Sequence, residues 1–255
     1  MRIATWNVNS VRARLDRLLP WLEAQSPDLV CLQETKCQDD VFPRELIEDL
    51  GYHIEAYGQK TYNGVALLSK TMPDGVIRGF GDERFDEEAR VIGASYGDVM
   101  VLNCYVVNGK EVGNVKYDYK LEWLAALRKH LASHFPSTEK VVVTGDFNVT
   151  FDDRDIYDPE MWRDKILCSK PERDALNAIV ADGYGDALRH LTDADEIYTW
   201  WDFRTRGFSG NRGLRIDHFL MSPSALEICT DVTVDLEARD GLKPSDHAPV
   251  IATIG

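Results

Sequence analysis

Short, almost wholly apolar runs recur along this chain, and they alternate with segments whose apolar residues repeat at helical spacing. A run that is apolar throughout, rather than at every second position, is typical of a strand covered on both faces. Eight such runs predict strands, at 3–8, 29–33, 65–68, 91–96, 99–106, 141–147, 216–221 and 250–254. Sheets buried on both faces need helices to cover them, so the sequence predicts an α/β fold.

Three segments carry helix signals. Between Val11 and Leu22 the apolar residues form one helical face behind a candidate N-cap at Ser10, and Pro20 predicts a kink or a late start. A second face runs over 121–135 and is stopped by Pro136. The segment 169–172 (Ser-Lys-Pro-Glu) is a capping box that opens a helix ending near Gly183.

The arrangement of these elements predicts a single domain over residues 1–255. No repeat, low-complexity tract or Gly/Ser/Pro linker interrupts the chain. The simplest architecture is two mixed β-sheets packed face to face with helices outside, and the alternative is one doubly wound sheet.

Composition limits the classes of partner. The chain has 29 Lys and Arg against 43 Asp and Glu, a formal net charge of −14. That balance excludes a protein that holds nucleic acid by bulk positive charge, although a local basic patch or a bound metal ion would permit it. The five cysteines lack CxxC spacing and no secretory or membrane-spanning pattern is visible, so we expect reduced thiols in a cytoplasmic monomer that binds no membrane.

Polar side chains stand where the predicted strands end. They are Asn7 and Asn9, Glu34, Asp146 and Asn148, Asp217, and the pair Asp246-His247. Oxygen donors without Cys/His spacing favour Mg²⁺ or Mn²⁺ over Zn²⁺. Singly, each residue has an ordinary explanation, such as a turn residue or, for Glu34, an ion pair with Lys36. Together they predict one site.

The same motifs carry a family resemblance. They are Trp6-Asn7-Val8-Asn9, Leu32-Gln33-Glu34-Thr35-Lys36, Tyr62-Asn63-Gly64-Val65-Ala66, Gly145-Asp146-Phe147-Asn148, Tyr198-Thr199-Trp200-Trp201, Gly213-Leu214-Arg215-Ile216-Asp217 and Ser245-Asp246-His247-Ala248-Pro249. In this order they resemble the exodeoxyribonuclease III family of class II abasic-site endonucleases, within the endonuclease/exonuclease/phosphatase superfamily. The resemblance implies a four-layer α/β sandwich and a Mg²⁺-dependent enzyme. Its substrate would be duplex DNA, cleaved 5′ to abasic sites or at 3′ ends.

The resemblance also implies roles for individual residues. Glu34 would be the principal metal ligand beside Asn7, and Asp146 would activate the attacking water. Asn148 and Tyr105 would serve the phosphate, and His247 would contact it while Asp217 orients the ring. The implied metal-site residues are Asn7, Glu34, Asp146, Asn148, Asp246 and His247.

Contacts to DNA are expected at two kinds of residue. Basic side chains near the site include Arg90, Lys116 and Lys120, and a glycine-rich loop carries Arg204, Arg206, Arg212 and Arg215. By resemblance, Trp200, Leu214 and Ile216 would form the apolar pocket for an extruded baseless sugar. The ordinary alternatives are solvated loop charges and core tryptophans.

Two other functions remain open at this point. One is a phosphatase or phosphodiesterase of small molecules, which the arginine-rich loop argues against. The other is an inactive nucleic-acid-binding regulator of the same fold, which the full set of acidic residues argues against. The sequence does not predict the ratio of abasic-site incision to exonuclease activity, the number of metal ions, or the role of the acidic segment 152–155.

Overall fold

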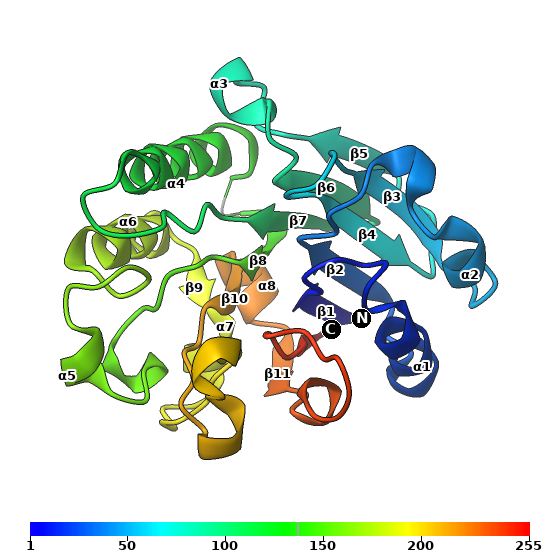
Figure 1. The fold of residues 1–255 in the computed structure, drawn as a ribbon. Coiled ribbons are helices and arrows are strands. Elements are labelled where there is room, and N and C mark those ends of the chain that lie inside the picture. The colour runs from blue at the N-terminus through cyan, green and yellow to red at the C-terminus, as the bar shows by residue number, and fades with distance from the viewer. Residues whose placement is uncertain (137) are drawn as a thin grey trace.

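Two six-stranded sheets form the centre of the molecule (Figure 1). The computed structural model describes residues 1–136 and 138–255. The first sheet contains, in spatial order, β11 (Cys229–Val234), β12 (Val250–Ile254), β1 (Arg2–Asn7), β2 (Leu29–Gln33), β4 (Val65–Ser69) and β3 (His53–Tyr57). The second contains β5 (Gly75–Arg78), β6 (Val91–Tyr96), β7 (Val99–Tyr105), β8 (Lys140–Asp146), β10 (Asp217–Met221) and β9 (Gly185–Asp186).

Both sheets are mixed. The pairs β1–β2 and β7–β8 run parallel, and the other neighbours run antiparallel. All eight strand predictions are confirmed within two residues at either end. The prediction of two packed sheets is also confirmed, and the alternative of one doubly wound sheet is wrong.

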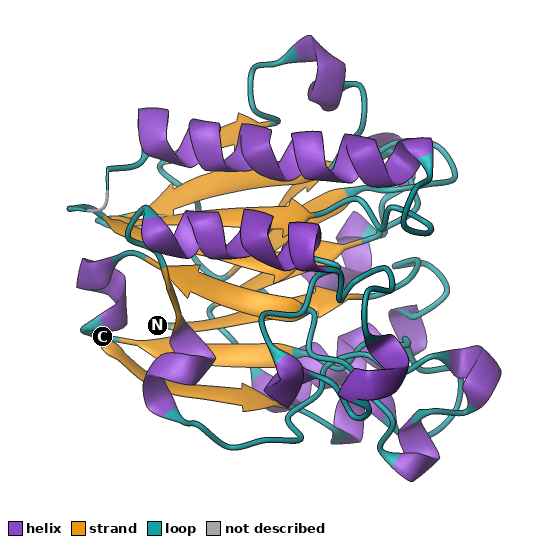
Figure 2. Cartoon of the chain, turned by 90° about the vertical axis from the view of Figure 1, so that its left-hand side faces the viewer, coloured by secondary structure: helices purple, strands orange, loops and turns teal. Residues whose placement is uncertain are grey.

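Helices cover the outer faces of the two sheets, which gives four layers (Figure 2). The helices are α1 (Leu15–Gln25), α2 (Arg44–Glu48), α3 (Glu83–Asp86), α4 (Val115–His134), α5 (Pro159–Trp162), α6 (Lys170–Ala181), α7 (Ala187–Leu191) and α8 (Pro223–Leu226). Figure 1 shows α1 and α2 on one side of the sheets and α4 and α6 on the other.

Three buried apolar clusters follow these layers. The largest lies between the sheets and includes Ile3, Leu67 and Val142. A second packs α1 against the first sheet, and a third packs α4 and α6 against the second sheet around Trp123. Strands that contribute to two clusters must be apolar on both faces, which explains the continuous runs.

The sequence signals match the start of α6 and the end of α4, although α4 starts at Val115, before the predicted segment 121–135. The capping box at Ser169 and Glu172 opens α6, and α4 ends at His134 before Pro136. Ser10 does not cap α1: its hydroxyl accepts from the N–H of Ala13 in a preceding turn, and the helix starts late, at Leu15. Pro20 then lies inside the helix, where its ring removes one backbone hydrogen bond.

Strands β3, β5, β9 and β11 were not predicted, and they are the four edges of the two sheets. An edge strand pairs on one side only and exposes more of its surface, so it tolerates polar residues and is short. β9 has two residues, and in β11 only Cys229 and Val232 are buried.

The described residues contain no helix that is long and apolar enough to cross a membrane. All five cysteines are free thiols, as predicted, and all five are buried.

Candidate active site

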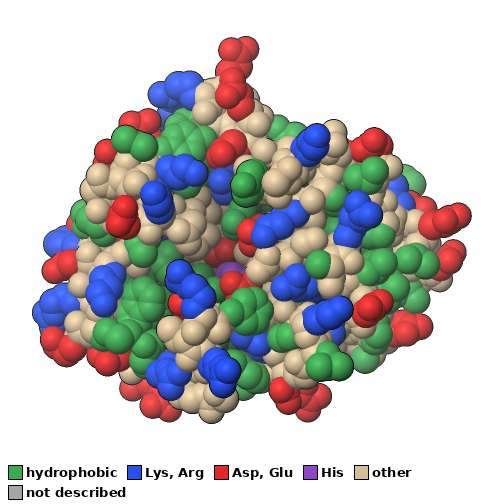
Figure 3. Space-filling model, viewed as in Figure 1, with side chains coloured by type: hydrophobic (Ala, Val, Ile, Leu, Met, Phe, Trp, Pro, Cys, Tyr) green, Lys and Arg blue, Asp and Glu red, His purple; other side chains and the backbone are tan. Residues whose placement is uncertain are grey.

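The polar strand ends meet at one place. In the second sheet Asp146 on β8 is the register partner of Tyr105 on β7 and of Asp217 on β10, so these three side chains lie side by side. Asn7, at the end of β1 in the other sheet, donates from Nδ2 to Asp146 Oδ2 at 2.9 Å. Figure 3 shows the result as a hollow with acidic and histidine side chains at its floor and Lys and Arg around it.

Asp146 is the centre of this hydrogen-bond network. Its Oδ1 accepts from the backbone N–H of Asn148 at 2.9 Å, and its Oδ2 accepts from the side-chain amides of Asn7 and Asn148 at 2.9 and 3.2 Å. Burial, together with the charge of Asp217, raises the pKa of Asp146 against the opposing effect of His247. A carboxyl with a raised pKa is a stronger base than an exposed aspartate, which suits proton transfer near neutral pH.

Gly145 allows the backbone before Asp146 to pack closely against β7. Its φ is +140°, and a Cβ at this position would lie 1.9 Å from the carbonyl oxygen of Cys104. Only glycine fits at position 145, and its close approach to β7 puts the carboxylate of the next residue, Asp146, in its place in the site.

His247 lies between two buried carboxylates. Its Nδ1 is 2.9 Å from Asp217 Oδ2, and its Nε2 is 3.7 Å from Asp146 Oδ2. Burial lowers the pKa of His247, but the charges of Asp217 and Asp146 outweigh it and raise the pKa above the usual range. The imidazole therefore carries a proton on each nitrogen, and Asp217 fixes its orientation.

Asn148 has a left-handed backbone conformation, with φ of +52°. Its Oδ1 accepts from the side chain of Asn108 at 3.0 Å, and its carbonyl oxygen accepts from the buried ammonium group of Lys120 at 2.6 Å. A fully buried ion pair with Glu172 of α6 neutralises Lys120. The backbone of Asn148 is thus fixed by Lys120 of α4, which is itself paired with Glu172 of α6.

Glu34 follows β2 directly, also with a positive φ of +55°. Lys36 Nζ lies 3.0 Å from its Oε1 and donates to Asn9 Oδ1 at 2.7 Å. Asn9 in turn donates to Asp246 Oδ1 at 2.9 Å, and Trp200 Nε1 donates to Asp246 Oδ2 at 3.1 Å. The ion pair considered from sequence is present, but it belongs to a network that joins Glu34 to Asp246.

Tyr105 is partly buried, and the guanidinium of Arg90 lies 4.9 Å from the centre of its ring. Burial and the charges of Glu34 and Asp146 raise the pKa of Tyr105 well above its usual value. The phenol therefore stays protonated and can donate a hydrogen bond. Arg90 itself is bound by Glu88 and by the carbonyl of Tyr105, so it positions the tyrosine.

The donor set fits a hard divalent cation. Hydrogen bonds and an ion pair through Asn7, Asn9 and Lys36 connect the carboxylates of Asp146, Asp246 and Glu34 into one cluster. Glu34 has Lys36 as its ion-pair partner and is 21% exposed, so a cation can reach its carboxylate. Carboxylate and amide oxygens at such a site suit Mg²⁺ or Mn²⁺.

Asp146, Asp217 and His247 form a second and tighter cluster of possible metal ligands. Ligand atoms of Asp146, Asp217 and His247 lie within 4.8 Å of one another. Because Asp217 and His247 are hydrogen-bonded to each other, this group resembles a proton relay more than an ion site. Asn148, like His247, has its polar side-chain atoms engaged with protein partners.

Three basic residues expected to face DNA do not do so. Arg90 is buried and bound by Glu88 and the carbonyl of Tyr105. Lys120 is fully buried against Glu172, and Arg215 is buried between Asp155 and Asp186. The three predictions are wrong because each side chain satisfies a carboxylate of the protein. Lys116, Arg206 and Arg212 are exposed, and Arg204 is exposed but paired with Asp202.

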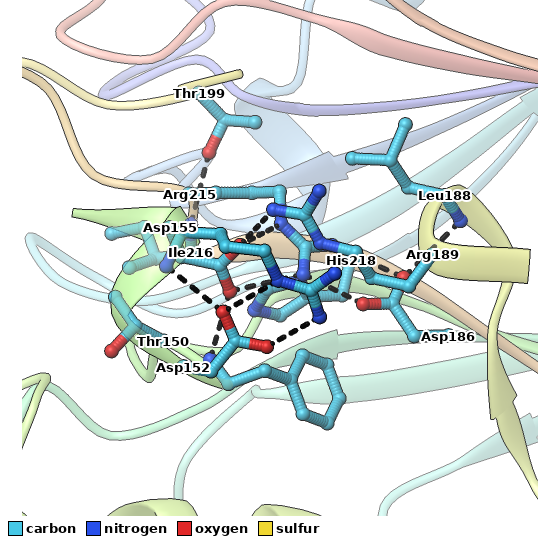
Figure 4. A network of polar contacts seen from close by, with 12 residues as sticks. Thr150, Asp152, Asp155, Asp186, Leu188, Arg189, Thr199, Arg215, Ile216 and His218 are labelled. Carbon is cyan, nitrogen blue, oxygen red and sulfur yellow. Dashed lines mark hydrogen bonds and ion pairs between the residues drawn. The ribbon is translucent and has the colours of Figure 1, made fainter. Parts of the chain in front are cut away.

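The cluster around Arg215 joins several segments (Figure 4). Its guanidinium forms two hydrogen bonds with Asp155, at 2.7 and 3.0 Å, and two with Asp186, at 2.6 and 3.1 Å. Arg189 adds a further bond to Asp155. His218, on the opposite face of β10 from Asp217, donates from Nε2 to the carbonyl of Val149 at 2.7 Å.

The expected apolar pocket forms a separate cluster. Trp200 is partly exposed and packs with Leu214, Ile216 and Trp162, whereas Trp201 is buried. Of these two adjacent tryptophans, Trp201 therefore faces the core and Trp200 does not. Leu214 and Ile216 are fully buried beneath Trp200, so within this cluster the tryptophan is the accessible surface.

The chain is similar to known proteins over its full length. A model of the Endonuclease/Exonuclease/phosphatase family matches residues 4–247. The chain belongs to this family. Exodeoxyribonuclease III of Haemophilus influenzae is 37% identical, with 99% of each chain covered.

Two solved structures are similar over the whole family fold. The 3′ phosphatase NExo from Neisseria, bound to a product DNA hairpin, is 41% identical with a TM-score of 0.95. An AP endonuclease from Archaeoglobus fulgidus is 36% identical with a TM-score of 0.96. Each comparison covers 100% of this chain and 99% of the other. The resemblance to the exodeoxyribonuclease III branch of the family, and its fold, are confirmed.

Sequence reasoning missed several supporting residues of this family site. Lys36 stands inside a recognised motif but was considered only as an ion-pair partner of Glu34, and Thr199, whose hydroxyl binds Asp217, also stands inside one. A buried hydroxyl has no distinguishing pattern in a sequence until its partner is located. Asn108 lies in a loop where the sequence offered no signal, and Asp155 lies in the acidic segment 152–155, to which no role was assigned.

Proposed function

We propose that this protein is a Mg²⁺-dependent DNA repair nuclease that hydrolyses phosphodiester bonds of duplex DNA. Its substrates are abasic sites, cleaved on their 5′ side, and 3′ ends, from which it removes nucleotides and blocking groups. The single observation that carries the proposal is the array Asp146–His247–Asp217 beside Asn7, Asn148 and Tyr105. It supplies a base and several hydrogen-bond donors at one phosphate-sized place.

The chemistry follows from charge. A phosphodiester repels an attacking water, so catalysis requires neutralisation and positioning. Bound Mg²⁺ supplies part of that neutralising charge, and Glu34, Asn7 and Asp246 would hold it. The protonated Nε2 of His247 is the donor for a non-bridging oxygen. The amide of Asn148 would be a second donor when it exchanges its bond to Val106 or Asp146 for one to the phosphate.

Asp146 is the base that accepts the proton of the attacking water. Its raised pKa supports this assignment, and its three hydrogen bonds fix the direction of its carboxylate. The phenol of Tyr105, which stays protonated, is placed to donate to the leaving oxygen. Mn²⁺ should substitute for Mg²⁺, since the ligands are oxygen atoms.

Selectivity for a baseless site rests on Trp200 and the buried side chains beneath it. A nucleotide without a base loses its stacking, so its sugar is displaced from the helix at low cost. Exposed Lys116, Arg206 and Arg212 are the residues that would contact phosphates. The family's relatives, named as an exodeoxyribonuclease, a 3′ phosphatase and an AP endonuclease, support the same range of substrates.

We also propose that the protein acts as a monomer in the cytoplasm. One chain supplies every residue of the site, and buried free cysteines suit a reducing compartment.

A labelled duplex with one abasic site tests the proposal. Wild-type protein with Mg²⁺ should nick it 5′ to the site, and chelator should abolish nicking. Asp146→Asn should lower the rate by a factor of about 10² to 10³, by analogy with loss of one transition-state contact, without unfolding the protein. Cleavage that survives chelation, or an Asp146→Asn protein of ordinary activity, would contradict the mechanism. Hydrolysis of small phosphodiesters in place of DNA would favour the phosphatase alternative.

A further inference from the structure

Thr199 lies between the two segments that carry Asp217 and His247. It is fully buried. Its backbone N–H donates to the carbonyl of Leu214 at 2.9 Å, and its own carbonyl accepts from the N–H of Ala248 at 2.8 Å. The backbone of this one residue thus ties the entry to β10 to the segment that contains His247.

The hydroxyl of Thr199 makes three further contacts. Its Oγ1 lies 3.1 Å from the backbone nitrogens of Ile216 and Asp217, and 2.6 Å from Asp217 Oδ2. The bond to Ile216 is at the edge of the network drawn in Figure 4.

Hydrogen-bond chemistry fixes the direction of that hydroxyl. Both backbone N–H groups are donors, so Oγ1 accepts from each of them. Its single hydrogen is then left for the carboxylate of Asp217. A charge-assisted O–H···O⁻ bond of 2.6 Å is short and directional.

The consequence reaches His247. Asp217 Oδ2 receives the hydroxyl of Thr199 and lies 2.9 Å from His247 Nδ1. With both bonds made, the carboxylate cannot rotate, and the imidazole is held with Nε2 directed toward Asp146. Without the hydroxyl, Asp217 retains only the histidine as a side-chain partner among the described residues.

We propose that Thr199 is a positioning residue for the Asp217–His247 pair, and that its hydroxyl sets the orientation in which His247 meets the phosphate. This inference rests on the proposed nuclease function. Thr199 itself does not touch substrate, so its loss should lower turnover and leave DNA affinity unchanged.

The experiment compares three variants at one position and one control. Thr199→Val keeps the shape of the side chain and removes the hydroxyl, and Thr199→Ser keeps the hydroxyl. If Thr199→Val does not fold, Thr199→Ala is compared with Thr199→Ser, because these two variants differ only in the hydroxyl. The control is Thr144→Val, because Thr144 is also fully buried and its hydroxyl donates to the carbonyl of His218, next to Asp217, without touching a carboxylate.

Three quantities are measured for each protein: kcat on the abasic duplex, Kd for a non-cleavable duplex, and the NMR signal of the His247 Nδ1 proton without metal. We expect kcat of Thr199→Val to fall by about 10- to 100-fold, the range for lost outer partners of a catalytic group. Kd should stay within about twofold, the proton signal should shift, and serine should restore both kcat and signal. Thr144→Val should match wild type in all three.

The proposal is overturned if Thr199→Val, or Thr199→Ala compared with Thr199→Ser, retains wild-type kcat. It is also overturned if Thr144→Val loses as much turnover, since the effect would then come from packing. These results differ from failure of the nuclease function itself, in which wild-type protein would not cleave the duplex.

Discussion

At the scale of single residues, the site works through pairs of unlike groups. The charges of Asp217 and Asp146 outweigh burial and raise the pKa of His247, and burial together with the charges of Glu34 and Asp146 raises the pKa of Tyr105. Each donor or base therefore depends on a neighbour that need not touch the substrate. A change at such a neighbour should affect catalysis as strongly as a change at a contact.

Asp217→Asn tests this dependence. An amide has nearly the same shape but presents a donor toward Nδ1, so the imidazole loses both its charge and its fixed orientation. By analogy with the buried aspartate of a serine protease triad, kcat should fall about 10³- to 10⁴-fold. Single-turnover cleavage of the abasic duplex measures it, and circular dichroism checks the fold. Asp182→Asn, an exposed partner of Arg128, is the control and should keep wild-type turnover. Equal rates in the two variants would remove Asp217 from the mechanism.

Gly145→Ala tests the close approach of β8 and β7. The new Cβ would lie 1.9 Å from a backbone oxygen, and φ of +140° is unfavourable for alanine. We expect the free energy of unfolding to fall by about 3 kcal/mol or more, measured in urea. Gly97→Ala is the matched control: its φ is +62° with nothing within 4 Å, so only the backbone cost of about 1–2 kcal/mol applies. Equal losses would show that the clash is relieved by movement of the strands.

At the scale of elements, the sequence predicted what is buried and missed what lies at edges. β2, β6 and β12 were predicted to the residue because strands covered on two faces must be continuously apolar. The edge strands β3, β5, β9 and β11 have no such requirement.

The site shows the same division. Asp146, Asp217 and His247 were predicted because chemistry restricts them to few residue types. Arg215 and Lys120 were misassigned to DNA, since a basic residue near a site looks the same whether it faces phosphate or a buried carboxylate. Only tertiary contacts, such as Asp155 with Arg215, distinguish the two cases.

Lys120 also joins α4 to α6 through Glu172, and this link predicts a coupling. Lys120→Met leaves a buried carboxylate without its cation and should cost about 3–5 kcal/mol. In the double variant with Glu172→Gln the neutral amide can still accept from the backbone of Leu167, so part of the loss should be recovered. Arg128→Met removes an exposed ion pair between the same two helices and should cost less than about 1 kcal/mol. Urea unfolding of wild type, Lys120→Met, Glu172→Gln and the double variant gives the coupling energy, and purely additive losses would mean that the pair is not coupled.

At the scale of the whole molecule, a net charge of −14 coexists with a site for a polyanion. The charges are arranged so that exposed Lys and Arg surround the hollow (Figure 3), while buried Arg215 and Lys120 are neutralised by acidic partners. These buried groups affect stability rather than DNA binding. Protonation of their acidic partners and of the neighbouring buried His218 should set how the molecule responds to acid.

His218 gives the clearest case. It is fully buried, and burial together with the nearby charge of Arg215 lowers its pKa from 6.5 to about 4. The neutral ring donates from Nε2 to Val149, while Nδ1 has no hydrogen-bond partner among the described residues. Between pH 6.5 and pH 4 the unfolded chain binds a proton that the folded protein does not. Stability from this group is therefore fully present above pH 6.5 and is lost as pH falls toward 4.

Comparison with His218→Phe isolates this effect, because phenylalanine keeps a ring between Phe147 and Phe151 and does not titrate. Above pH 7.5 the two proteins should differ by a constant free energy of unfolding, which reports the lost hydrogen bond. Between pH 6.5 and 4 the wild-type protein should lose about 3 kcal/mol more than the variant, since one pKa unit corresponds to about 1.4 kcal/mol. Urea unfolding at half-unit pH steps measures both curves, and the contributions of Asp146 and His247 cancel in the difference. Parallel curves over the whole range would show that His218 has the same pKa in the folded and the unfolded chain. A loss of stability below about pH 4 that both proteins share would then point to Asp155, whose pKa Arg215 holds at about 2 against the effect of burial.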